Sequence, residues 1–181
     1  MLKSIMIVLL FTISLYANSI DGRTALHNAV YYEKTEEVET LLKHGANVNA
    51  QNRAGLTSLH IAIKKRDLDM AEILIQNRAD IDAQDLNGIT PLLLAIKKRN
   101  LMLVRFLILK GADVDLENDS GITPLHQAAY SGYAPIAEYI LDVGADANVI
   151  NQFGYTPFDF AVAKKNLAIV EMLRDYTKYK K

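Results

Sequence analysis

The chain has 181 residues, and 20 lysines and arginines stand against 21 aspartates and glutamates, so its formal net charge at pH 7 is −1. Proteins that coat nucleic acid by charge are strongly basic, and this balance argues against that class. Half of the residues are hydrophobic, which excludes a mainly disordered chain, and there is no cysteine for a disulfide, a thiolate nucleophile or a thiolate metal ligand.

The first 17 residues, MLKSIMIVLLFTISLYA, differ in character from the rest of the chain. Lys3 precedes an uncharged, mostly apolar run over residues 5–16, and Ala17 stands before the polar segment NSIDG. This order is typical of a secretory signal peptide, and the run is shorter than the roughly 20 apolar residues that span a bilayer. We expect residues 1–17 to be a signal peptide cleaved after Ala17, although Leu15 is larger than the residue preferred there. A buried helix that caps the fold and an uncleaved membrane anchor are the alternatives.

The remaining chain repeats with a period of 33 residues. The three most regular positions are a glycine, a threonine two residues later and an alanine five residues after that. The glycines are Gly22, Gly55, Gly88, Gly121 and Gly154. Self-similarity of this length indicates stacked supersecondary units. We place five units within residues 18–176, at about 19–51, 52–84, 85–117, 118–150 and 151–176, and a basic tail at 177–181.

The fourth unit shows how each repeat is expected to fold. Thr123 stands where a helix N-cap hydroxyl belongs, and Pro124 suits the first helical turn. Apolar residues then recur at helical spacing through LHQAA, and Gly132 ends this short helix. A second helix is expected over APIAEYILDV, after which GADAN returns the chain.

These segments resemble a known repeat family. The copies DGRTALHNA, AGLTSLHIA, NGITPLLLA, SGITPLHQA and FGYTPFDFA resemble the turn and first helix of ankyrin repeats, and HGANVNA, NRADIDA, KGADVDL and VGADANV resemble the loop after the second helix. The resemblance covers about residues 19–176. It implies an all-α fold, an α-solenoid of helix-turn-helix units with β-hairpin-like loops, and a noncatalytic role in protein–protein recognition.

Some positions depart from the family pattern. The glycine that ends the first helix at Gly132 is replaced by Glu33, Arg66, Arg99 and Lys165. The next residue in three repeats is Asp67, Asn100 or Asn166, types that tolerate left-handed turns. Arg78 replaces the glycine after the second helix of the second unit, so we expect a strained or shifted turn there.

The histidines at His27, His60 and His126 follow the repeat period, which indicates a structural role. In ankyrin repeats such a histidine and the threonine three residues before it hydrogen-bond locally, a task that a neutral imidazole suits because it both donates and accepts. The sequence has no P-loop, HExxH or GxSxG motif. We therefore expect no enzyme activity, metal or cofactor. An enzyme would need polar groups that converge on one cavity.

Partner binding should use positions that the repeat pattern leaves free. In ankyrin proteins these are commonly the hairpin tips and the inner face of the first helix. The basic segments IKKRD and IKKRN form a stripe between tyrosines there, which favours an acidic partner, although a solvated lysine face is the alternative. The candidate residues are Tyr31, Tyr32, Arg53, Lys64, Lys65, Arg66, Leu86, Ile89, Lys97, Lys98, Arg99, Tyr130, Tyr133 and Tyr155.

The sequence as a whole predicts an exported module, periplasmic or secreted and of bacterial type. We expect a monomer that binds a protein partner, without nucleic acid and without a membrane contact apart from the export signal. Two alternatives stay open at this point: an adaptor tethered to the membrane by the uncleaved signal, and a secreted effector that acts on host proteins.

Overall fold

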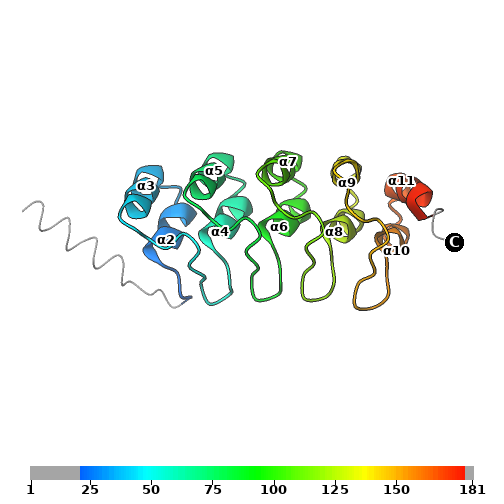
Figure 1. Ribbon diagram of the computed structural model, residues 1–181, viewed down its shortest axis with the longest axis horizontal. Helices are drawn as coiled ribbons and strands as arrows, with labels where there is room; N and C mark the ends of the chain where they lie inside the picture. Colours follow the sequence, from blue (N-terminus) through cyan, green and yellow to red (C-terminus); the bar gives the residue numbers. More distant parts are fainter. Residues whose placement is uncertain (1–20, 178–181) are drawn as a thin grey trace, which may run out of the picture. The chain divides into compact units, whose positions relative to one another are not determined.

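The computed structural model describes residues 21–177, which contain ten helices and no strand (Figure 1). The expected all-α class is confirmed. The predicted signal peptide lies outside the described residues, as does the predicted tail from residue 178 onward. The chain divides between Leu86 and Asn87 into two compact units.

The first unit holds two helix pairs. Its helices are α2 (Ala25–Tyr31), α3 (Thr35–Lys43), α4 (Ser58–Lys65) and α5 (Leu68–Gln76). Each first helix contacts the second helix that follows it, and α2 also contacts α4. Leu26, Val38, Leu59 and Leu74 are buried in this unit. A single helix pair cannot bury both of its faces, so the contact between α2 and α4 is part of the core.

The second unit holds three helix pairs. Its helices are α6 (Pro91–Lys97), α7 (Leu101–Leu109), α8 (Pro124–Ser131), α9 (Ala134–Asp142), α10 (Pro157–Ala163) and α11 (Leu167–Thr177). Helix α8 contacts both α6 and α10. The repeated alanines Ala95, Ala128 and Ala161 are fully buried on these three helices. Their small side chains let neighbouring first helices approach closely.

Every first helix begins at the expected threonine. The hydroxyl of Thr24, for example, accepts the backbone N–H of His27 at 3.3 Å, which satisfies one of the unpaired donors at the helix start. Where the third helical residue is histidine or Asp159, its side chain accepts the threonine N–H in return and completes a capping box. Leu93 has no acceptor, so α6 keeps only the threonine half of this arrangement.

The turn between the two helices of a pair differs from the expectation in one respect. The left-handed residue is Glu33, Arg66, Arg99 or Lys165, with φ between 54° and 64°, and not the residue that follows. Asp67 and Asn100 instead cap α5 and α7, where their side chains accept the N–H groups of Met70 and Leu103. The cap requires an extended backbone, so the left-handed turn falls one residue earlier whatever side chain stands there. Arg78, with φ of 67°, confirms the strained turn expected after α5.

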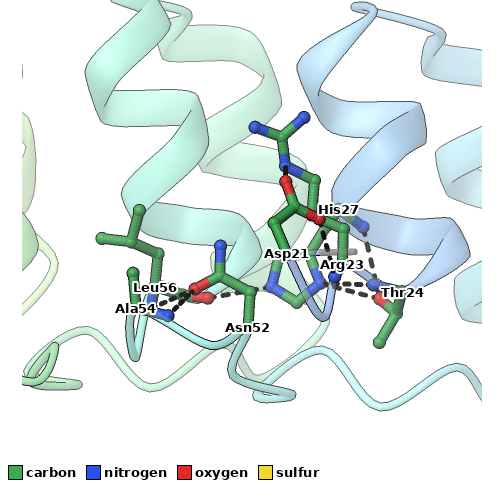
Figure 2. A network of polar contacts seen from close by, with 7 residues as sticks. All are labelled: Asp21, Arg23, Thr24, His27, Asn52, Ala54 and Leu56. Carbon is green, nitrogen blue, oxygen red and sulfur yellow. Dashed lines mark hydrogen bonds and ion pairs between the residues drawn. The ribbon is translucent and has the colours of Figure 1, made fainter. Parts of the chain in front are cut away.

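The loops before the first helices are held by an asparagine that the sequence interpretation did not single out. The side-chain oxygen of Asn52 accepts the N–H groups of Ala54 at 2.9 Å and Leu56 at 3.0 Å, as Figure 2 shows. Asn118 and Asn151 do the same one and two units further along the second compact unit. Their recurrence at the repeat period was the available signal. The loops are thus hairpin-like in their turns, without a strand in residues 21–177.

Candidate protein-binding surface

The framework histidines are used up by structural hydrogen bonds. The Nδ1 atom of His27 accepts the backbone N–H of Thr24 at 3.1 Å, and its Nε2 atom lies 2.9 Å from the carbonyl oxygen of Leu56 in the next repeat (Figure 2). Because a backbone N–H only donates and a carbonyl only accepts, the ring is neutral with its proton on Nε2. His126 repeats this arrangement with the carbonyl oxygen of Tyr155 at 2.9 Å.

Burial lowers the pKa of both His27 and His126, while the hydrogen bond from Nε2 to the neighbouring carbonyl opposes that shift. Both rings are fully buried. The structural role expected for these two residues is therefore confirmed, and they do not form part of an exposed site.

Within residues 21–177, no group of three or more histidine, aspartate or glutamate side chains is arranged to hold a metal ion. Across the same described part of the chain, none of the helices has the length and apolar character needed to cross a bilayer.

In the first unit, cations gather around Tyr31. The guanidinium carbon of Arg23 lies 4.6 Å from the centre of the Tyr31 ring, and the Lys65 ammonium lies 5.2 Å from it. Tyr32 meets the same ring edge-on at 5.2 Å. Both tyrosines are exposed, at 40% and 64%. Cation–π contacts of this kind hold aromatic rings in place at a surface.

Acidic partners reduce the basic character that the sequence predicted at Lys65. Its ammonium lies 2.8 Å from the carboxylate of Glu33, and this hydrogen bond raises the pKa of Lys65. Lys64 and Lys97 are exposed at the ends of α4 and α6, and neither forms an ion pair within residues 21–177. These two helices belong to different compact units, so a continuous basic stripe stays a prediction.

The remaining candidates vary in exposure. Arg99 donates a hydrogen bond to the carbonyl oxygen of Ser131 and so serves the structure of the second unit. Leu86 is 68% exposed, which suits a contact residue. Arg53 and Arg66 are also exposed, whereas Ile89, Lys98 and Tyr133 are only partly accessible.

Two of the predicted tyrosines meet at a pocket in the second unit. Tyr130, at the end of α8, and Tyr155, in the loop before α10, line a cavity of about 350 Å³. The other lining residues are Asp159, Phe160, Ala163 and Lys164. The Lys164 ammonium lies 4.1 Å from the centre of the Tyr130 ring, and the Phe160 ring meets that of Tyr130 at 6.3 Å between centroids.

The sequence interpretation missed Phe160 as a surface residue. It stands six residues after the repeat glycine, where the other units have Asn28, Ile61, Leu94 and Gln127. The single aromatic at this variable position was a signal that could have identified it. The pocket itself needs the distance between a helix and a loop of adjacent repeats, which sequence spacing does not provide.

Comparison with known proteins agrees with the geometry. The family model described as ankyrin repeats, in three copies, matches residues 3–85 and 92–181, which is nearly the whole chain. A search of curated proteins finds no significant match. The paired helices, the capped threonine turns and this match together place the chain in the ankyrin repeat family, whose members generally serve as protein–protein interaction modules.

Proposed function

We propose that the chain is a noncatalytic recognition module of five ankyrin repeats that binds a partner protein through the ends of its first helices and its loop tips. The observation that carries the proposal is the exposure of Tyr31, Tyr32, Tyr130 and Tyr155, which are between 40% and 64% accessible. The framework threonines and histidines are in contrast engaged in capping. Tyrosine is enriched among the residues that dominate binding energy at protein interfaces.

The chemistry of this surface favours a partner with an acidic face. Lys64 and Lys97 extend from the last turns of α4 and α6 without a carboxylate partner in the described chain, and Lys164 lies on an aromatic ring. Such charges steer association and select against basic partners. We propose that the chain acts as a monomer toward this partner.

The test is affinity capture from native extract with the full chain as bait. The test variant combines Lys64→Glu and Lys97→Glu. The matched control combines Lys43→Glu and Lys110→Glu, which make the same charge change at the ends of the second helices α3 and α7. Circular dichroism establishes that all three baits are folded.

We expect a protein that the wild-type and control baits retain and that the test variant loses. Because both variants carry the same net charge, such a loss reports the position of the lysines. If the test variant retains the same proteins as the control, binding through the first-helix lysines is wrong.

We also propose that residues 1–17 direct export and are removed after Ala17, which would place the module in the periplasm or outside the cell. The apolar run over residues 5–16 supports this proposal. Mass spectrometry of fractionated cells should find an exported chain that begins at Asn18. An exported mass that includes residues 1–17 would favour the tethered adaptor, and a protein found only in the cytoplasm would contradict export.

A further inference from the structure

The pocket beside Tyr130 differs from the equivalent surface three repeats earlier. Tyr31 and Tyr130 are related by three periods of 33 residues, and so are Lys65 and Lys164. In both places the lysine lies over the tyrosine ring, at 5.2 Å in the first unit and 4.1 Å in the second. The two sites therefore start from the same arrangement of a cation on an aromatic face.

The carboxylate that balances the lysine is present at only one of these sites. Glu33 pairs with Lys65 at 2.8 Å, but the position equivalent to Glu33 is Gly132. Within residues 21–177, Lys164 has no carboxylate within ion-pair distance. Its charge is thus available to an acidic group from outside this part of the chain.

The one acidic residue that lines the pocket already has a structural role. The Oδ2 atom of Asp159 accepts the backbone N–H and the hydroxyl of Thr156, each at 2.8 Å, and this contact completes the capping box of α10. Asp159 therefore holds its charge at the start of α10. Lys164 lies just past the other end of the same helix, so the two charges do not cancel by direct contact.

The walls of the pocket are aromatic and firmly held. The Phe160 ring packs edge-on against both Tyr130 and the buried His126, whose ring is fixed by hydrogen bonds to Thr123 and to the carbonyl oxygen of Tyr155. The backbone that carries Tyr155 is thus tied to the same histidine. Tyr130 and Tyr155 are nevertheless about half exposed, at 50% and 55%, so the pocket opens to solvent.

We propose that this pocket is the anchor site of the partner: it takes one aromatic side chain from a partner segment whose neighbouring carboxylate pairs with Lys164. A cavity of about 350 Å³ is near the lower end of ligand-pocket sizes and has room for one large side chain. Aromatic rings stack favourably on one another beyond their burial alone. The inference rests on the proposed recognition function and specifies the chemistry of the segment that the surface recognises.

The test uses capped dipeptides as probes and the ¹⁵N-labelled full chain, with binding followed by NMR. The probes are acetyl-Glu-Phe-amide, acetyl-Lys-Phe-amide and acetyl-Glu-Ala-amide. We expect acetyl-Glu-Phe-amide to shift the amide signals of Phe160, Ala163 and Lys164. Loss of the aromatic ring should weaken binding at least about tenfold, because a buried phenylalanine side chain contributes on the order of 1.5–3 kcal/mol.

Two pairs of variants separate the pocket from nonspecific effects. Ala163→Trp fills the cavity from an exposed helix position and should abolish probe binding, whereas Val162→Trp adds the same bulk at an exposed position that does not line the pocket. Lys164→Glu should weaken the Glu-Phe probe about fivefold, as expected for loss of an exposed ion pair. Lys165→Glu makes the same charge change one residue away and should leave binding unchanged.

The inference is overturned if acetyl-Glu-Phe-amide binds no better than acetyl-Lys-Phe-amide, if Ala163→Trp binds the probe like the wild type, or if no probe shifts the pocket signals. Each of these results leaves the capture experiment intact, since a partner retained through Lys64 and Lys97 would still establish a recognition module. Failure of the capture experiment with successful probe binding would instead preserve the pocket and remove the proposed lysine surface.

Discussion

At the scale of single residues, each framework histidine joins two repeats through opposite edges of one ring. In His126, Nδ1 accepts from Thr123 within the helix cap, while Nε2 donates to the carbonyl oxygen of Tyr155 in the next loop. Protonation of Nδ1 would place a donor against the Thr123 N–H and break the cap. The neutral ring is thus the form that the fold needs.

The stability of the chain should consequently fall as the pH drops below the ordinary histidine pKa of about 6.5. Burial lowers the pKa of His27 and His126 in the folded chain, so the unfolded chain binds more protons in this range and gains stability relative to the native state. The loss should begin as the pH falls through 6.5 and level off below the folded pKa values. Thermal unfolding of the full chain between pH 7.5 and pH 5 measures it.

The His126→Gln variant should be less stable than the wild type at neutral pH and should lose part of this pH dependence. If wild type and variant lose stability in parallel over the same pH range, the histidine is not the titrating group.

The local part of this arrangement could be predicted from the sequence, and the rest could not. A threonine followed three residues later by histidine fixes the capping contact, because both residues lie in one helical turn. The second bond, from Nε2 to Tyr155, depends on how far the next repeat lies from the first. The pocket of Tyr130, Tyr155 and Phe160 depends on the same distance, so the sequence indicated two of its tyrosines without bringing them together.

At the scale of elements, the loops of successive repeats form a regular ladder. The N–H of Leu86 donates to the carbonyl oxygen of Ala54 at 3.2 Å in the first unit, and that of Gln152 donates to Ser120 at 3.3 Å in the second. A Cβ atom added at Gly121 would lie 2.8 Å from the Gln152 nitrogen. The repeated glycine therefore lets one loop approach the next, besides permitting a positive φ.

Gly154 is the matched control for this contact. It occupies the same repeat position with φ of 80° against 73° at Gly121, but a Cβ atom there would meet nothing within 4 Å. We expect Gly154→Ala to cost about 1–2 kcal/mol from the left-handed backbone alone. Gly121→Ala should cost about 1–3 kcal/mol more, because the methyl group displaces the neighbouring loop.

Urea unfolding of the two glycine variants, compared with the wild type, measures this difference. Equal losses of unfolding free energy would mean that the loop contact contributes nothing beyond backbone conformation.

At the scale of the whole molecule, stability should be distributed along the chain by contacts between neighbours. Helix α8 contacts α6 and α10, and α11 contacts α10 and α9. The last helix buries Ile169, Val170 and Leu173 and leaves Arg174 and Asp175 exposed, as expected of an end that faces solvent. In such a fold a local defect weakens the adjacent repeats more than remote ones.

The Leu173→Ala variant tests this distribution, with Leu167→Ala as its control in the same helix. Leu173 is fully buried and its truncation should cost about 2–5 kcal/mol, whereas Leu167 is 74% exposed and its loss should cost little. Hydrogen exchange measured by mass spectrometry should then accelerate in α8 to α11 of the Leu173→Ala variant and stay nearly unchanged in α2 to α5. Acceleration of the same size in every helix would show that the chain opens as one cooperative body, because a neighbour-coupled fold confines the loss to the repeats that touch the defect.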